Sequence, residues 1–272
     1  TFSEALWSQY KDARLSASGQ NDGPPTAGLR ADDAAYQVAI WNWDRDVIDN
    51  DHAAPPFQPA MVSKEYPHPE MVFGREANPY PKGAAVLHML RLKLGEETFW
   101  RGVHLYLNRH RNQSVETFQF RLCMEEVSGL SLQRFFDQWC YRPGVPRLKV
   151  SHAWDSATGS LTVTAEQTQP IDGPNPAFAI DLPIWIDAGE GRPREIVITG
   201  DDRVSTASVS LPREPRRIVV DPDLSLLADL DIDDAAERFI TMLRDGPTLA
   251  SKMQAVRELE TDPGTGGVTA LA

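Results

Sequence analysis

The spacing of hydrophobic residues changes its period once, within residues 141–150 (YRPGVPRLKV), and this change limits the folds open to the chain. Before this segment, apolar residues recur every three to four positions, as they do on one face of a helix. After it, apolar and polar residues alternate, as they do in a strand with one buried face. The sequence therefore predicts an α+β protein with a helical part followed by a β part.

The helical part is expected to cover residues 1–144. Gly95 and Gly129 are expected at helix C-termini, because glycine readily adopts the left-handed conformation that ends a helix. Ser114 and Ser131 are expected N-caps, because a serine hydroxyl can accept a bond from an open backbone N–H. Four short helices are expected in the second half of this part. The earlier expected helices lie at about residues 1–17 and 31–49.

Six short alternating segments after residue 144 predict a small β-sandwich over residues 145–222. They are RLKVSHAWD, SLTVTAEQ, FAIDLPIWID, REIVITG, ASVSL and RRIVVD. The helical spacing returns from Asp233, with Asp245, Gly246 and Pro247 separating two helices. Such a pair is typical of a helical repeat. Residues 223–272 are therefore expected to begin an α-solenoid domain, and the strands are expected to end near Asp221.

The charge and composition exclude several classes of function. The chain has 27 Lys and Arg against 39 Asp and Glu, a formal charge of -12, whereas nucleic-acid binding needs a basic surface. No apolar run approaches the roughly 20 residues of a membrane span. Cys123 and Cys140 fall within helical patterns, which predicts buried thiols and no disulfide. The chain begins without Met inside a helix-like pattern and reads as a piece of a longer protein. Compartment and oligomeric state stay open.

The sequence contains none of the self-contained catalytic motifs H-E-x-x-H, G-x-S-x-G, the P-loop or C-x-x-C. None of the six histidines forms an i, i+4 pair. His88 lies among apolar residues and is interpreted as a partly buried histidine rather than a ligand. A basic helix face is interpreted as solvated in preference to an anion site. It consists of Arg101, His104, Arg109, His110 and Arg111.

The segment NPYPKG places Tyr80 between two prolines at the end of a proline-rich passage, residues 51–81. Proline fixes its own φ and disfavours the helical region for the residue before it. A helix is therefore expected to begin at Pro81, with Asn78 and Tyr80 outside the helical region and Tyr80 at the N-cap. Two interpretations remain from these residues alone: Tyr80 packs the loop, or it is held in place for chemistry.

Residues 80–150 carry a longer pattern: Y-x-K-G, a helix that ends in L-G, S-G-x-x-L, and W followed by G-x-P. This pattern resembles the gluzincin zinc aminopeptidases, the family of alanyl aminopeptidase. The stretch TAEQTQP is similar to a glutamine-rich strand of that family, and the opening TFSEALW is similar to the stretch that follows its third zinc ligand. The residues that carry the pattern are Tyr80, Lys82, Gly83, Leu94, Gly95, Phe99, Tyr106, Ser128, Gly129, Leu132, Trp139, Gly144 and Pro146.

The resemblance implies a fold and an activity. Residues 1–144 would form the helical C-terminal part of a thermolysin-like catalytic domain, ahead of the β-sandwich and the helical repeats. The longer protein would use zinc to release N-terminal amino acids from a peptide substrate. The zinc ligands and the general base would lie upstream of Thr1, so this chain is expected to bind no zinc and to be inactive by itself. The alternative is a scaffold or interaction module of the same family that has lost the metal.

The resemblance also implies a catalytic role for Tyr80. In the family, the tyrosine of Y-x-K-G points its phenol at the tetrahedral intermediate. Tyrosine suits this task because a phenol of ordinary pKa, near 10, remains a neutral O–H donor at working pH. Such a donor accelerates the reaction only if it is positioned in advance. Lys82 and Gly83 are expected to be structural, the lysine covering the helix start and the glycine allowing another element to approach closely.

Overall fold

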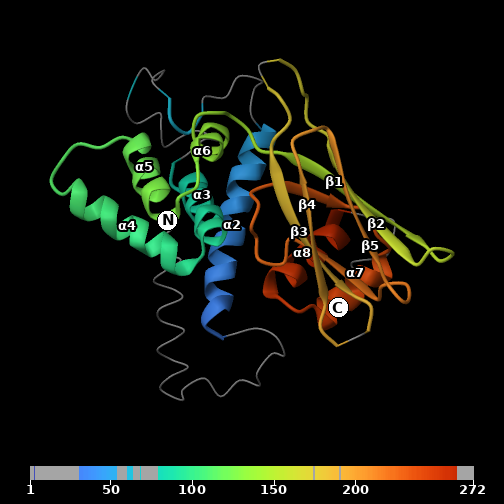
Figure 1. The fold of residues 1–272 in the computed structure, drawn as a ribbon. Helices are drawn as coiled ribbons and strands as arrows, with labels where there is room; N and C mark the ends of the chain where they lie inside the picture. Colours follow the sequence, from blue (N-terminus) through green and yellow to red (C-terminus); the bar gives the residue numbers. More distant parts are fainter. Residues whose placement is uncertain are drawn as a thin grey trace. The chain divides into compact units, whose positions relative to one another are not determined.

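The computed structural model describes residues 3, 31–53, 60–63, 68, 79–173, 175–189 and 191–261. Helices come first, then strands, then two further helices, so the chain is of the mixed α+β type that the sequence predicts (Figure 1). Two compact units are present, Thr1–Ser3 with Asn42–Val145 and Glu4–Trp41 with Pro146–Ala272. The chain leaves the first unit after Val145, in the segment where the hydrophobic spacing changes its period.

Five helices precede the strands within the described residues. The prediction of a helix near residues 31–49 and of four short helices after it is confirmed, whereas the expected helix at 1–17 lies outside the described residues apart from Ser3. Gly95 and Gly129 follow two of these helices with φ of 77° and 70°, as expected for C-terminal glycines. The helices are α2 (Ala31–Ala53), α3 (Pro81–Leu94), α4 (Glu96–Arg109), α5 (Thr117–Ser128) and α6 (Gln133–Trp139).

The expected serine N-caps are wrong. Helix α5 is capped by Glu116, whose backbone N–H donates to Oε1 of Gln119 at 2.7 Å as part of a capping box. Helix α6 is preceded by Leu132, which is fully buried. A glutamate can replace serine at α5 because its carboxylate accepts the backbone N–H of the third helical residue, as a serine hydroxyl would.

Helices α4 and α5 pack closely against each other. Tyr106 and Phe120 meet edge to face with their ring centroids 5.1 Å apart. Arg109 donates two hydrogen bonds to the carboxylate of Glu126, at 2.8 and 2.9 Å, and Arg101 donates one to the carbonyl oxygen of Val127 at 2.8 Å. The predicted basic face is exposed at four of its five residues, as expected of a solvated face, and two of its arginines also bind groups on α5.

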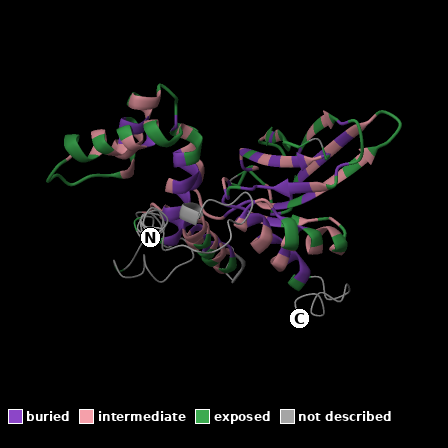
Figure 2. Ribbon diagram, turned by 90° about the horizontal axis from the view of Figure 1, so that it is seen from below, coloured by how far each residue is buried: buried purple, intermediate pink, exposed green. Residues whose placement is uncertain are grey.

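Among the residues that the structure describes, seven strands form two sheets, with strand orders β5-β2-β1-β7 and β4-β3-β6. Buried residues alternate with less buried ones along the strands, as Figure 2 shows, so each sheet buries one face. The six predicted alternating segments correspond to β1–β6. The strands are β1 (Arg147–Asp155), β2 (Ser160–Gln167), β3 (Ile180–Asp187), β4 (Arg194–Gly200), β5 (Val204–Ser210), β6 (Arg217–Val220) and β7 (Asp229–Ile232).

Strand β7 corrects the expectation that the strands end near Asp221. It pairs in parallel with β1, from Arg147 opposite Asp229 to Val150 opposite Ile232. Only four residues long, it contains two aspartates, so its sequence shows little strand character. Its strand conformation comes from pairing with a distant partner. Part of the range 223–272, which was expected to begin a helical-repeat domain, therefore belongs to a sheet.

Two helices complete the second unit, α7 (Ala236–Asp245) and α8 (Leu249–Thr261). Met242 of α7 and Ala255 of α8 share a buried cluster with Val219 of β6, and Trp185 of β3 packs against it. These helices thus bury apolar surface on the strands, which the sequence did not predict. Further repeats after them stay a prediction. Within the described ranges, no helix combines the length and apolar character needed to cross a membrane.

Candidate functional site at the start of α3

Helix α3 begins at Pro81, as predicted, and Tyr80 occupies its N-cap position. The expectation that Tyr80 avoids helical dihedral angles is wrong, because its φ and ψ are -72° and -63°. The carbonyl oxygens of Pro79 and Tyr80 accept the backbone N–H groups of Gly83 and Ala84, at 3.1 and 3.0 Å. These two bonds offset the steric penalty of a helical residue before proline. Asn78 lies outside the described residues.

The side chain of Tyr80 is 53% exposed, so its ring is not part of the core. It does not cap the helix, since α3 has no side-chain cap bond at this end. The first turn of α3 also contains no acidic residue, so no carboxylate of that turn neutralises the positive end of the helix dipole. The phenol thus stands at a helix end that favours negative charge.

Lys82, two residues further on, is almost completely buried, with 2% of its surface exposed. Its ammonium nitrogen donates a hydrogen bond to the carbonyl oxygen of Gly144 at 3.1 Å. Burial lowers the pKa of Lys82 to about 8, and the negative charge of Asp51 acts in the opposite direction. The sequence suggested a lysine stem over the helix start; the structure instead places the charged end inside the unit.

The first turn of α3 faces two segments that are distant in sequence. Met61 lies beside Gly83, where an added Cβ would be 3.9 Å from its sulfur atom. That is an ordinary contact distance, so the packing does not require glycine there. The backbone N–H of Val62 donates to the carbonyl oxygen of Cys140 at 2.9 Å, which joins residues 60–63 to the end of α6.

The described groups near this turn do not suit a zinc ion. Lys82 carries an ammonium group, which has no lone pair to offer a metal. Burial raises the pKa of the Cys140 thiol to about 12, so this thiol is protonated at neutral pH. Across the described part of the chain, no group of three or more His, Cys, Asp or Glu side chains is arranged to hold a metal. His88, on α3, is buried with 5% of its surface exposed.

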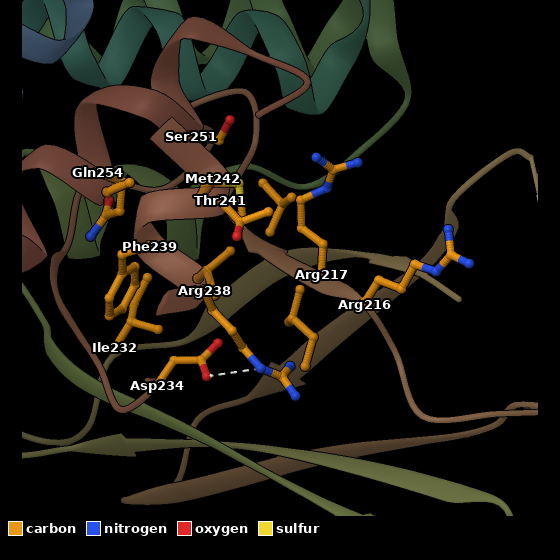
Figure 3. Close-up of a pocket in the computed structure, with 14 residues that line it drawn as sticks. Arg216, Arg217, Ile232, Asp234, Arg238, Phe239, Thr241, Met242, Ser251 and Gln254 are labelled. Atoms are coloured by element: carbon orange, nitrogen blue, oxygen red, sulfur yellow. Dashed lines mark ion pairs between the residues drawn. The ribbon is translucent and has the colours of Figure 1, made fainter. Parts of the chain in front are cut away.

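A small hollow lies in the other compact unit, between β6 and helices α7 and α8 (Figure 3). Its volume of about 30 Å³ holds little more than a water molecule. Arg217 binds the carboxylate of Asp187 at 3.0 Å, and Arg238 binds Glu214 at 3.1 Å. In Figure 3 the guanidinium groups of Arg216 and Arg217 point away from Phe239. This hollow is a packing gap with paired arginines at its rim.

The sequence pattern identified Tyr80 and Lys82 but not the partners of Lys82. Gly144 lies 62 positions away and was noted only as part of a family pattern. Its φ of 78° is in the left-handed region, and an added Cβ would lie 3.5 Å from Oδ1 of Asp51. Asp51 lies in the last turn of α2, beyond the predicted end of that helix near residue 49 and within the passage in which the sequence predicted no long regular structure. In the sequence, Gly144 was marked only by the G-x-P pattern that it forms with Pro146.

Comparison with known proteins finds sequence similarity to peptidases over the segment that contains Tyr80 and Lys82. The peptidase family M1 domain matches residues 31–139. Aminopeptidase N of Caulobacter vibrioides is 37% identical over 83 residues, which are 30% of this chain and 10% of that protein. Aminopeptidase N of Escherichia coli is 34% identical over 91 residues, 34% of this chain and 10% of that protein. A glutamyl aminopeptidase of Bitis rhinoceros is 27% identical over 135 residues, 50% of this chain and 14% of that protein.

The fold comparison finds a similar fold over more of the chain. A crystal structure of Legionella pneumophila aminopeptidase A in complex with aspartic acid matches with a TM-score of 0.63, at 14% identity, over 85% of this chain and 27% of that one. The chain thus spans only a small part of its relatives' length. Residues 31–139, which include Tyr80 and Lys82, match the peptidase family M1 domain, and the sequence relatives are aminopeptidases, in agreement with the resemblance to the zinc aminopeptidases that the sequence predicted.

Proposed function

We propose that this chain is part of an aminopeptidase that hydrolyses the N-terminal peptide bond of its substrate, and that Tyr80 is a catalytic residue. The observation that carries the proposal is the exposure of Tyr80, of whose surface 53% is accessible, at the start of α3 within the family-matched segment. A tyrosine needed only for packing would be expected to bury its ring. Tyr80 instead leaves about half of its surface accessible to solvent.

The chemistry assigned to Tyr80 is a hydrogen bond to an oxyanion. When water attacks a peptide carbonyl, negative charge develops on the carbonyl oxygen. A neutral phenol donates to that oxygen without itself losing a proton, and the positive end of α3 favours the same charge. In this family a zinc ion activates the attacking water; its ligands are expected upstream of this chain. Tyr80 supplies only the donor.

The experiment is Tyr80→Phe in the longer protein of which this chain is proposed to be part. The variant keeps the ring and the backbone and removes the O–H donor. We expect kcat to fall by roughly 100- to 1,000-fold, the usual effect of losing one oxyanion donor. KM should change little, because the bond is stronger in the transition state than in the ground state.

Tyr141→Phe is the matched control, since Tyr141 lies just beyond α6 and is 42% exposed. Its kcat should stay within about twofold of the wild type, as is usual for surface changes. If kcat of Tyr80→Phe is also within about twofold of the wild type, Tyr80 is not catalytic and only packs the loop. If the longer protein itself lacks the zinc motif and hydrolyses no aminoacyl amide, the scaffold alternative replaces the enzyme.

The isolated 272-residue chain is expected to bind no stoichiometric zinc and to cleave no aminoacyl amide, because it is expected to carry only one catalytic group. Metal analysis of the purified chain after dialysis tests this. One tightly held zinc ion per chain would contradict it and would place ligands within the chain.

A further inference from the structure

We infer that Lys82 is a positioning residue for Tyr80: its buried ammonium group holds the first turn of α3 against the backbone at Gly144 and so sets where the Tyr80 phenol stands. The role of Tyr80 in this inference rests on the proposed function. The anchoring of the turn by Lys82 rests on the geometry alone.

Tyr80 and Lys82 belong to one rigid turn. Tyr80 has helical dihedral angles, and its carbonyl oxygen accepts the N–H of Ala84 at 3.0 Å. The carbonyl oxygen of Pro79 accepts the N–H of Gly83 at 3.1 Å. Any shift of Lys82 is therefore transmitted to the backbone of Tyr80. The prolines at 79 and 81 fix the internal geometry of this turn.

The prolines cannot fix where the turn lies in the unit, because they restrict only local dihedral angles. Lys82 makes the connection over distance, through the 3.1 Å bond to the Gly144 carbonyl oxygen, 62 residues later. The side chain is 2% exposed, so water competes little for this bond. The left-handed φ of Gly144, 78°, belongs to the backbone geometry that presents this carbonyl.

The charges around Lys82 explain why a buried cation is retained. The Asp51 carboxylate favours the protonated form, Arg142 opposes it, and the Cys140 thiol is uncharged at neutral pH. Burial lowers the pKa of Lys82 to about 8, which leaves most of the ammonium protonated at pH 7. A buried cation is costly, so a simple spacer would be better served by a methionine.

Amide hydrogen exchange of the 272-residue chain tests whether Lys82 holds the first turn of α3 in place. The variant is Lys82→Met, and the control is Lys93→Met, an exposed lysine in the last turn of the same helix. The reporters are the amides of Gly83 and Ala84. We expect both to exchange about 10-fold faster in Lys82→Met, with the Leu90 amide in mid-helix unchanged. Unchanged exchange at Gly83 and Ala84 would overturn the anchoring.

If Lys82→Met does not fold, an NMR titration of the wild-type chain decides the question. The amide resonances of Gly83 and the carbonyl carbon of Gly144 should shift together with a midpoint near the Lys82 pKa of about 8. These nuclei lie on the two sides of the hydrogen bond between Lys82 and the Gly144 carbonyl oxygen. The absence of a shared transition between pH 7 and 10 would show that Lys82 does not link them.

The connection to Tyr80 is tested by a double-mutant cycle in the longer protein. Lys82→Met alone should lower kcat by about 10- to 100-fold, with KM within about twofold, because a small displacement of a catalytic group is enough for such a loss. In the Tyr80→Phe background, Lys82→Met should lower kcat by less than about twofold.

An equal loss in both backgrounds would mean that Lys82 acts on stability and not through Tyr80. A wild-type kcat for Tyr80→Phe alone would instead overturn the proposed function of Tyr80. The hydrogen-exchange result on the chain would then still decide the anchoring, so the two failures are distinguishable.

Discussion

The side-chain amide of Gln167 makes two hydrogen bonds to the backbone of Phe178, donating from Nε2 to the carbonyl oxygen and accepting the N–H at Oε1, both at 2.8 Å. Nε2 also donates to the carbonyl oxygen of Asp202 at 3.1 Å, and Oε1 accepts Nε2 of Gln169 at 2.8 Å. Gln167 is completely buried. It thereby joins the end of β2 to the segment that leads into β3, in the other sheet.

Gln167→Leu should lower the free energy of unfolding by roughly 2–5 kcal/mol, because it removes two partners of a buried backbone segment and fills the space with an apolar group. The matched control is Gln133→Leu, an exposed glutamine at the start of α6, for which a change within about 0.5 kcal/mol is expected. Urea denaturation of the three proteins measures both values. A loss below about 1 kcal/mol for Gln167→Leu would contradict the assigned role.

Deletion of residues 223–272 should abolish the cooperative melting of the β part. The deletion removes β7, which pairs with β1, and with it Leu227 and Leu230, which are 1% and 6% exposed. Burial of each leucine contributes roughly 2 kcal/mol. Deletion of residues 234–272 keeps β7 and is the control, although it exposes the cluster around Val219. We expect this shorter deletion to melt cooperatively at lower temperature. Cooperative melting of both truncations would show that β7 is dispensable.

Two glycines in neighbouring helices should respond oppositely to alanine. At Gly102, an added Cβ would lie 2.2 Å from the sulfur of Met124, which is fully buried. The overpacking should lower the free energy of unfolding by about 1–2 kcal/mol. At Gly83, the Cβ meets only Met61 at 3.9 Å, so better helix propensity should raise stability by up to about 1 kcal/mol. Thermal melting measures both, and a shift of equal sign would contradict the packing.

Asp221 should make stability fall as pH rises from about 4 to 7. Its carboxylate accepts three hydrogen bonds, from the backbone and hydroxyl of Ser225 and from the N–H of Leu226. Burial nevertheless raises its pKa to about 6, above the ordinary 3.8. The unfolded chain therefore loses this proton at lower pH than the folded chain, so the stabilisation present below pH 4 is lost as pH passes 6.

The matched variant is Asp221→Asn, which cannot titrate. The difference in free energy of unfolding between this variant and the wild type should rise by up to roughly 3 kcal/mol from pH 4 to pH 7 in favour of the variant. The amide also changes the three hydrogen bonds, but that effect is the same at every pH. Urea denaturation of both proteins across this range gives the difference. A difference that is independent of pH would show that the carboxyl has the same pKa in the folded and unfolded protein.

The order of helices and strands and the start of α3 at Pro81 could be predicted from the sequence, whereas the catalytic role of Tyr80 stays a prediction. Each depends on local properties: the spacing of apolar residues, the fixed φ of proline, and a short family pattern. Strand β7 could not be predicted, because four residues with two aspartates form a strand only when β1 lies beside them. The helical dihedral angles of Tyr80 could not be predicted either, because hydrogen bonds within the turn outweigh a local steric preference.

The sequence by itself determined which elements form, with the exception of β7, since their apolar periods and helix ends are local properties of the chain. Only the tertiary structure decided what Lys82 and Gln167 do. Both were ordinary polar residues in a pattern, yet Lys82 is 2% exposed and binds Gly144, while Gln167 binds Phe178 in a completely buried position. A polar side chain becomes structurally decisive when burial removes competing water. Burial depends on which distant segments come together.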